Sequence, residues 1–204
     1  ALKGQDIMAQ AKTGSGKTLA FLLPIIEQVM RREASAPAPG PYAKSGPGHL
    51  SGPKFLVLAP TRELALQIEM ELRKYAPMSV TSLSVYGGTP IERHYRALQR
   101  PPMVVVGTPG RLLDLAGSGH LKLGGVTFLV MDEADQMLDR GFLRDIQRII
   151  RLLPVERQTL LFSATFSGEI QTLAQTMQRN PARISVDPGI STPTTIVHAY
   201  YVVP

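Results

Sequence analysis

The sequence predicts an α/β fold, an open and mostly parallel β-sheet with helices on both faces. Two observations carry this prediction. Short apolar runs alternate with longer segments of helical period along most of the 204 residues. The runs are apolar on both faces, which is typical of parallel strands covered by helices on both sides. The length allows one sizeable domain, and 44% hydrophobic with 19% charged residues is an ordinary globular composition.

The expected elements follow in chain order. Strands are predicted at residues 7–10, 54–59, 80–86, 103–106, 126–131, 158–162 and 183–186. Helices are predicted at residues 17–32, 62–75, 91–99, 142–153 and 168–178, with a helical turn through residue 115. In the first helix we expect Leu22, Leu23 and Ile26 to face inward. Pro24 should bend that helix or mark its surface side.

Two segments differ in composition from the rest. Residues 33–53 are rich in Ala, Pro, Gly and Ser, and we expect an exposed loop insertion there. An insertion that the surface merely tolerates is favoured over a segment with a binding role. Residues 187–194 resemble a linker, and residues 195–204 read as the start of a truncated second domain. The prediction is therefore one domain over residues 1–186. The apolar segment 196–203 is expected to lie along this domain or across a neighbour's edge.

Charge and cysteine content limit the kinds of partner and of metal site that the sequence allows. A net charge of +6 fits a polyanionic partner, although many basic domains bind no nucleic acid. The chain has no cysteine and only four scattered histidines, so we expect no disulfide and no zinc site. No apolar run reaches membrane-spanning length, and the start is neither a signal nor a transit peptide. We expect no membrane partner and a cytoplasmic protein.

A phosphate-binding loop follows the first predicted strand. Its residues are Ala11, Lys12, Thr13, Gly14, Ser15, Gly16, Lys17 and Thr18. A strand, a glycine-containing loop ending in Lys-Thr and then a helix present backbone N–H groups and a positive helix end to one anion. The two glycines permit close backbone approach, Lys17 supplies a positive charge, and Thr18 supplies a hydroxyl for Mg²⁺. This pattern predicts a nucleoside triphosphate site.

Two further loops carry polar groups directly after apolar strands. Asp132 and Glu133 follow residues 128–131, where one carboxylate can hold a metal opposite Thr18 and the other can activate water. The alternative is that Asp132 caps the next helix. Ser163 and Thr165 follow the strand at 158–162. Their hydroxyls can bridge the nucleotide site to another surface, but spacing alone favours an N-cap for the helix at 168.

Three more loops fall at the same predicted edge of the sheet. They contain Pro60, Thr61 and Arg62, then Gly87 and Gly88, then Thr108, Pro109, Gly110 and Arg111. Hydroxyls, helix-start amides and guanidinium groups bind a phosphodiester backbone without reading bases. Each loop alone also fits an ordinary turn or cap. Their convergence on one edge of a basic chain favours nucleic-acid binding.

Together these motifs resemble the ordered signature set of the DEAD-box RNA helicases. The resembling segments lie at residues 11–18, 60–65, 87–88, 108–111, 132–135 and 163–165. The resemblance spans most of the chain and implies the first of two RecA-like P-loop domains. Residues 138–142, 161–167 and 180–181 are most similar to the bacterial RhlE-type branch.

The resemblance also implies roles. Residues 11–18 would bind ATP and Mg²⁺, with Lys17, Asp132 and Glu133 catalytic and Thr18 and Asp132 at the metal. The residues of the three loops at 60–62, 87–88 and 108–111 would hold the RNA backbone. Asp135, Ser163 and Thr165 would couple hydrolysis to closure on a second RecA-like domain.

The expected function is that of an ATP-dependent RNA helicase that locally unwinds duplexes. The family's upstream adenine-reading segment and the arginine fingers of its second domain are missing from the sequence, so we expect this domain alone to be nearly inactive. Two alternatives remain open, a P-loop NTPase of another class and an RNA-clamping scaffold without hydrolysis.

Overall fold

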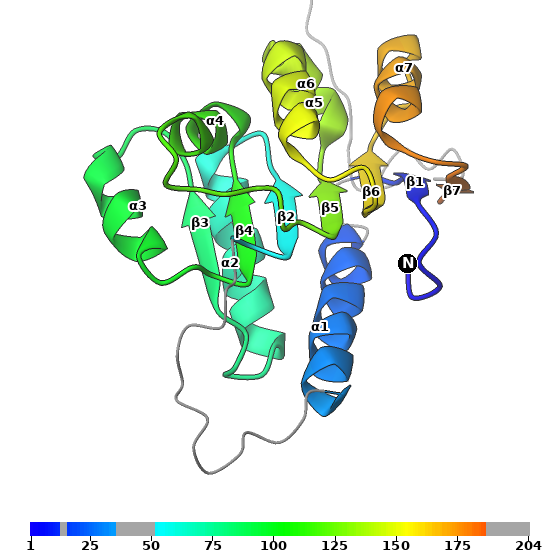
Figure 1. Ribbon diagram of the computed structural model, residues 1–204. Helices are drawn as coiled ribbons and strands as arrows, with labels where there is room; N and C mark the ends of the chain where they lie inside the picture. Colours follow the sequence, from blue (N-terminus) through cyan, green and yellow to red (C-terminus); the bar gives the residue numbers. More distant parts are fainter. Residues whose placement is uncertain (13–15, 36–51, 187–204) are drawn as a thin grey trace, which may run out of the picture.

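A seven-stranded parallel sheet forms the centre of the computed structural model, which describes residues 1–12, 16–35 and 52–186 (Figure 1). The strands are β1 (Ile7–Gln10), β2 (Phe55–Leu58), β3 (Ser82–Val85), β4 (Val104–Gly107), β5 (Phe128–Met131), β6 (Gln158–Ser163) and β7 (Ala182–Ser185). Their order across the sheet is β3-β4-β2-β5-β6-β1-β7. All six neighbouring pairs run parallel. The predicted mostly parallel sheet is thus parallel throughout.

Helices cover both faces of this sheet. They are α1 (Lys17–Ser35), α2 (Arg62–Tyr75), α3 (Ile91–Leu98), α4 (Pro109–Gly117), α5 (Ala134–Asp139), α6 (Leu143–Leu152) and α7 (Gly168–Met177). Helices α1 and α2 lie on one face, and α4 to α7 lie on the other (Figure 1). No helix in the described part of the chain is long and apolar enough to cross a membrane.

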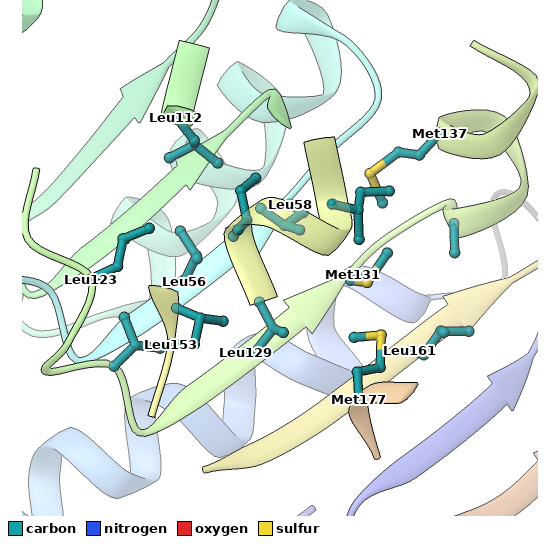
Figure 2. Packing of buried hydrophobic residues seen from close by; sticks show 14 of the residues in the cluster. Leu56, Leu58, Leu112, Leu123, Leu129, Met131, Met137, Leu153, Leu161 and Met177 are labelled. Carbon is teal, nitrogen blue, oxygen red and sulfur yellow. The ribbon is translucent and has the colours of Figure 1, made fainter. Parts of the chain in front are cut away.

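Side chains alternate along the buried strands and so build two cores, one on each face of the sheet. In β2, Leu56 and Leu58 face the helices α4 to α7, whereas Phe55 and Val57 face α1 and α2. Figure 2 shows the first of these cores, where Leu56, Leu129 and Leu161 of neighbouring strands meet side chains from the helices above them. Burial on both faces explains why these strands read as continuous apolar runs.

The predicted elements are all present, with small shifts at their ends, and α5 is an additional short helix. One side chain of α1 was predicted wrongly, since Leu23 is 57% exposed. Pro24 is buried and so does not mark the surface side, and the predicted bend of the helix stays a prediction. The helix buries Phe21, Leu22 and Ile25. The residues predicted as a loop insertion largely fall outside the described ranges, as do the predicted linker and second-domain start.

The end of β4 packs so tightly that a side chain has no room there. A Cβ at Gly107 would lie 2.5 Å from Val85 Cγ2, 2.7 Å from the Val85 carbonyl oxygen and 3.1 Å from Leu112 Cγ. We therefore expect Gly107→Ala to lower the free energy of unfolding by about 1–3 kcal/mol, as overpacked sites do. Urea unfolding measures this change.

Gly117→Ala is the matched control, because nothing lies within 4 Å of a Cβ at the end of α4. It should leave stability equal to the wild type or raise it slightly. Equal stability of the two variants would contradict the close approach of β4 and β3.

Candidate nucleotide and nucleic-acid interface

The predicted site residues lie at the carboxyl-terminal edge of the sheet, in two adjoining groups. Because all strands run parallel, each loop after a strand emerges at the same edge. The neighbouring strands β1, β6 and β5 end at the phosphate loop, Ser163 and Asp132. The neighbouring strands β2, β4 and β3 are followed by Thr61, Thr108 and Gly87. We call these the nucleotide half and the RNA half of the edge, after the ligands that the sequence predicts for them.

In the nucleotide half, Lys17 opens α1 and is only 8% exposed. Its ammonium donates to the Ala11 carbonyl oxygen at 2.9 Å, and the Ala11 N–H donates to the Ser163 carbonyl at 3.0 Å. The loop is thereby tied to the end of β6. Gly16 has φ +83°, a conformation that glycine adopts without strain. Thr13, Gly14 and Ser15 lie outside the described residues.

Asp132 is the most deeply buried carboxylate of the edge, with 2% of its surface exposed. Burial raises its pKa to about 6, although the positive charge of Lys17 opposes the shift. A buried carboxylate next to a phosphate loop fits a divalent cation, which would relieve this cost. Thr18 lies partly buried at the start of α1. Within the described ranges no three metal-binding side chains gather, so Mg²⁺ would need phosphate and water oxygens to complete its shell.

Glu133 occupies a left-handed backbone conformation, φ +52° and ψ +53°, directly before α5. This residue holds the N-cap position of α5 and makes no side-chain cap bond. The alternative that Asp132 caps the helix is therefore wrong, since among the described residues its Oδ1 accepts from the adjacent Glu133 N–H, at 3.0 Å, and from no N–H inside α5. The Glu133 carboxylate accepts from Gln136 Nε2 at 2.7 Å, which fixes its orientation.

Asp135 connects α5 to the loop after β6. Its Oδ2 accepts from the Ala164 N–H at 3.0 Å, and Gln10 Nε2 donates to the Ala164 carbonyl at 3.2 Å. The Ser163 hydroxyl accepts from the Thr165 N–H at 3.4 Å. The N-cap of α7 is Ser167, which accepts from Ile170 N–H at 3.3 Å. The N-cap interpretation of Ser163 and Thr165, favoured on spacing alone, is therefore wrong.

In the RNA half, each of the three loops presents a group that suits a phosphate backbone. The exposed Arg62 guanidinium lies 4.8 Å from the centroid of the Tyr86 ring. The Thr108 side chain makes no cap bond at the start of α4, so it does not occupy the N–H groups of Gly110 and Arg111 that follow Pro109. Gly87 and Gly88 are exposed, whereas three other residues predicted to bind RNA are buried or occupied in the protein itself. Pro60 and Pro109 are buried, and Thr61 caps α2 by accepting from Leu64 N–H at 3.1 Å.

The Arg111 side chain is largely buried and bonded within the protein, unlike an exposed arginine that is free to bind phosphate. Its side chain is 12% exposed, and both Nη atoms donate to the Thr89 carbonyl oxygen at 3.0 Å. Its Nη1 also lies 3.0 Å from His94 Nδ1. The guanidinium therefore holds the loop after β3 against the start of α4. Its predicted contact with RNA stays a prediction.

Sequence reasoning missed Tyr86 and His94. The His94 ring meets the Tyr86 ring edge to face, with centroids 5.7 Å apart, and only 4% of His94 is exposed. One signal was available in the sequence: His94 lies at helical spacing with Ile91 and Leu98 on the inward side of α3. A histidine on such a face has a partner inside the protein.

A parallel sheet covered on both faces, with a phosphate loop after β1 and a buried Asp at the end of β5, defines a RecA-like nucleotide-binding domain. The sequence pattern of the DEAD/DEAH box helicases matches residues 1–173. The chain belongs to this family.

Individual proteins of the same family are similar to this chain over most of its length. The chain is 46% identical over 186 residues to "DEAD-box ATP-dependent RNA helicase 3A, chloroplastic" of Zea mays, covering 91% of this chain and 24% of that protein. It is 43% identical to "DEAD-box ATP-dependent RNA helicase CshA" of Geobacillus kaustophilus (strain HTA426), covering 91% of this chain and 36% of that protein. The chain thus spans about a quarter to a third of the length of these relatives. Assignment to the RhlE-type branch stays a prediction.

Solved structures show the same fold. A DEAD box protein from the hyperthermophile Methanococcus jannaschii superposes with a TM-score of 0.76 at 34% identity, over 91% of this chain and 47% of that one. The yeast DEAD-box splicing factor Prp28 superposes with a TM-score of 0.78 at 35% identity, over 90% and 41%.

Proposed function

We propose that this chain is the ATP- and RNA-binding N-terminal domain of an ATP-dependent RNA helicase that locally unwinds duplexes. One observation supports this above all: the nucleotide half and the RNA half are consecutive stretches of a single sheet edge. Hydrolysis and RNA binding therefore act on one rigid element. The relatives named above carry the words ATP-dependent RNA helicase in their names.

In this proposal the chain's own residues prepare ATP for attack by water. Lys17, now bonded to the Ala11 carbonyl, turns its ammonium to the terminal phosphates. Asp132 and Thr18 would hold Mg²⁺, which supplies charge neutralisation at the phosphates. Glu133, oriented by Gln136, accepts the proton of the attacking water.

Asp135, Ser163 and Thr165 would couple hydrolysis to domain closure, and the bond between Asp135 and the Ala164 N–H, which joins α5 to the loop after β6, supports this role. A second RecA-like domain closing on this edge would contact that loop and supply arginine fingers. Without such a domain the transition state would lack that charge, so we propose that this domain by itself hydrolyses ATP very slowly. A cytoplasmic location belongs to the same proposal and rests on the sequence alone.

Glu133→Gln tests the hydrolytic assignment in a protein that joins this chain to its second RecA-like domain. RNA-stimulated ATP turnover should fall on the order of 10²- to 10⁴-fold, because the general base is lost. Binding of Mg²⁺–ATP should be unchanged, since glutamine keeps the shape of the side chain. The matched control is Glu169→Gln, an exposed residue of α7, which should turn over like the wild type.

Two outcomes would point to the rival functions. Unchanged turnover in Glu133→Gln would remove the hydrolytic assignment and favour a scaffold that only clamps RNA. Equal stimulation of the wild type by single-stranded DNA and RNA would favour a P-loop NTPase of another class.

A further inference from the structure

The RNA half is held together by a chain of contacts through one buried histidine. Arg111 at the start of α4 donates twice to the Thr89 carbonyl in the loop after β3. His94 of α3 contacts Arg111 on one side and Tyr86 on the other. Tyr86 in turn lies under the Arg62 guanidinium of α2. All three loops of the RNA half are therefore linked through the His94 ring.

The contact between His94 and Arg111 defines the protonation state of the imidazole. A guanidinium has donors and no acceptor, so Nδ1 of His94 must accept at the observed 3.0 Å. The single ring proton then sits on Nε2, and the ring is neutral. A second proton on Nδ1 would place two donors and two positive charges against each other.

The surroundings of His94 oppose a positive ring. Burial is the main cause that lowers the pKa of His94, and the positive charges of Arg111 on α4 and Arg93 on α3 lower it further. The Tyr86 ring faces it from the end of β3. The Asp114 carboxylate lies 3.7 Å from Arg111 Nε and is itself largely exposed. At neutral pH the acceptor is therefore intact.

We infer that His94 is a positioning residue of the RNA half: as a neutral imidazole it holds Arg111 against the Thr89 carbonyl and supports Tyr86 beneath Arg62. This inference rests on the proposed function and deepens it. Protonation of His94 expels the Arg111 guanidinium and loosens the loop at Gly87–Gly88 from the start of α4. RNA affinity then falls on acidification, while the nucleotide half, on other strands, is unaffected.

His94→Gln and His94→Ala separate these effects in the 204-residue chain. Glutamine can accept from Arg111 without titrating, whereas alanine removes the acceptor at every pH. The readouts are anisotropy of a fluorescein-labelled oligouridylate, from about pH 7.5 to about pH 5, and binding of a fluorescent ADP with Mg²⁺. The ratio of wild-type to His94→Gln RNA affinity should fall about tenfold over this range, the loss expected for one buried hydrogen bond to a charged group. His94→Ala should bind RNA about tenfold more weakly already at about pH 7.5.

His120→Gln is the matched control, because His120 is exposed and its ring stacks on Tyr95. It should retain the wild-type pH profile. ADP binding should agree between wild type and His94→Gln at every pH. A wild-type profile that matches His94→Gln, or full RNA affinity in His94→Ala, would overturn the inference.

Nitrogen-15 NMR of the imidazoles decides the geometry without RNA. His94 should show the Nε2–H tautomer at about pH 7.5 and convert to the charged ring only below the ordinary histidine range. An Nδ1–H tautomer or a charged ring at neutral pH would overturn the inference even if RNA binds. Conversely, a chain that binds no RNA at any pH but shows the Nε2–H tautomer would refute the proposed function and leave His94 holding Arg111.

Discussion

Lys17→Ala should weaken binding of Mg²⁺–ATP and Mg²⁺–ADP by at least about 100-fold, the cost of truncating one partner of a buried charge pair. Two losses act together. The phosphates lose the ammonium now held at the Ala11 carbonyl, and Asp132 loses the positive charge that favours its ionised form. Titration calorimetry of the chain with nucleotide measures the change.

Lys122→Ala is the control for loss of one lysine. Lys122 is exposed and precedes β5, at the opposite edge of the sheet, so the variant should bind nucleotide like the wild type. Nucleotide affinity within threefold of the wild type in Lys17→Ala would mean that the phosphates bind elsewhere. Urea unfolding of both variants separates lost binding from lost folding.

Asp132→Asn should stabilise the nucleotide-free chain at alkaline pH. The same change should abolish the Mg²⁺-dependent binding of nucleotide. Burial raises the Asp132 pKa from 3.8 to about 6, so the folded protein holds this proton more tightly than the unfolded chain. The wild type therefore loses stability as the pH rises from about 4 through about 6. Above that range the charged carboxylate costs up to about 3 kcal/mol, from about 2 pKa units at 1.36 kcal/mol each. Asparagine carries no such cost.

Urea unfolding in EDTA at about pH 4, 6 and 8 checks the sign. The stability difference between Asp132→Asn and the wild type should be near zero at about pH 4 and largest at about pH 8. Asp139→Asn, an exposed carboxylate of α5, should show a pH-independent difference. A wild type more stable than Asp132→Asn at about pH 8 would show that the folded protein favours the ionised carboxylate. A binding residue that destabilises the ligand-free protein is expected where a buried charge is compensated only when its ligand binds.

The central strands β2, β4 and β5 could be predicted because burial on both faces favours apolar side chains at every position. In β2 and β5 the side chains of both faces are buried, so the runs were visible without structure. The helix α5 was missed because six residues are too short to show a helical period. Leu23 was misplaced because periodicity does not fix exactly which side of a helix faces the core, and α1 turns Phe21 and Ile25 inward instead.

The sequence by itself determined the chemistry of the edge, since the phosphate loop, Asp132-Glu133 and the three RNA-half loops are local patterns directly after apolar strands. Only the tertiary structure decided which loops are neighbours. The strand order places β6 between β1 and β5, so Ser163 lies between the phosphate loop and Asp132 although the chain separates them widely. Contacts such as Asp135 with Ala164 and His94 with Arg111 join residues from different elements. Local patterns cannot encode them, because hydrogen-bond partners are chosen by how the helices pack on the sheet.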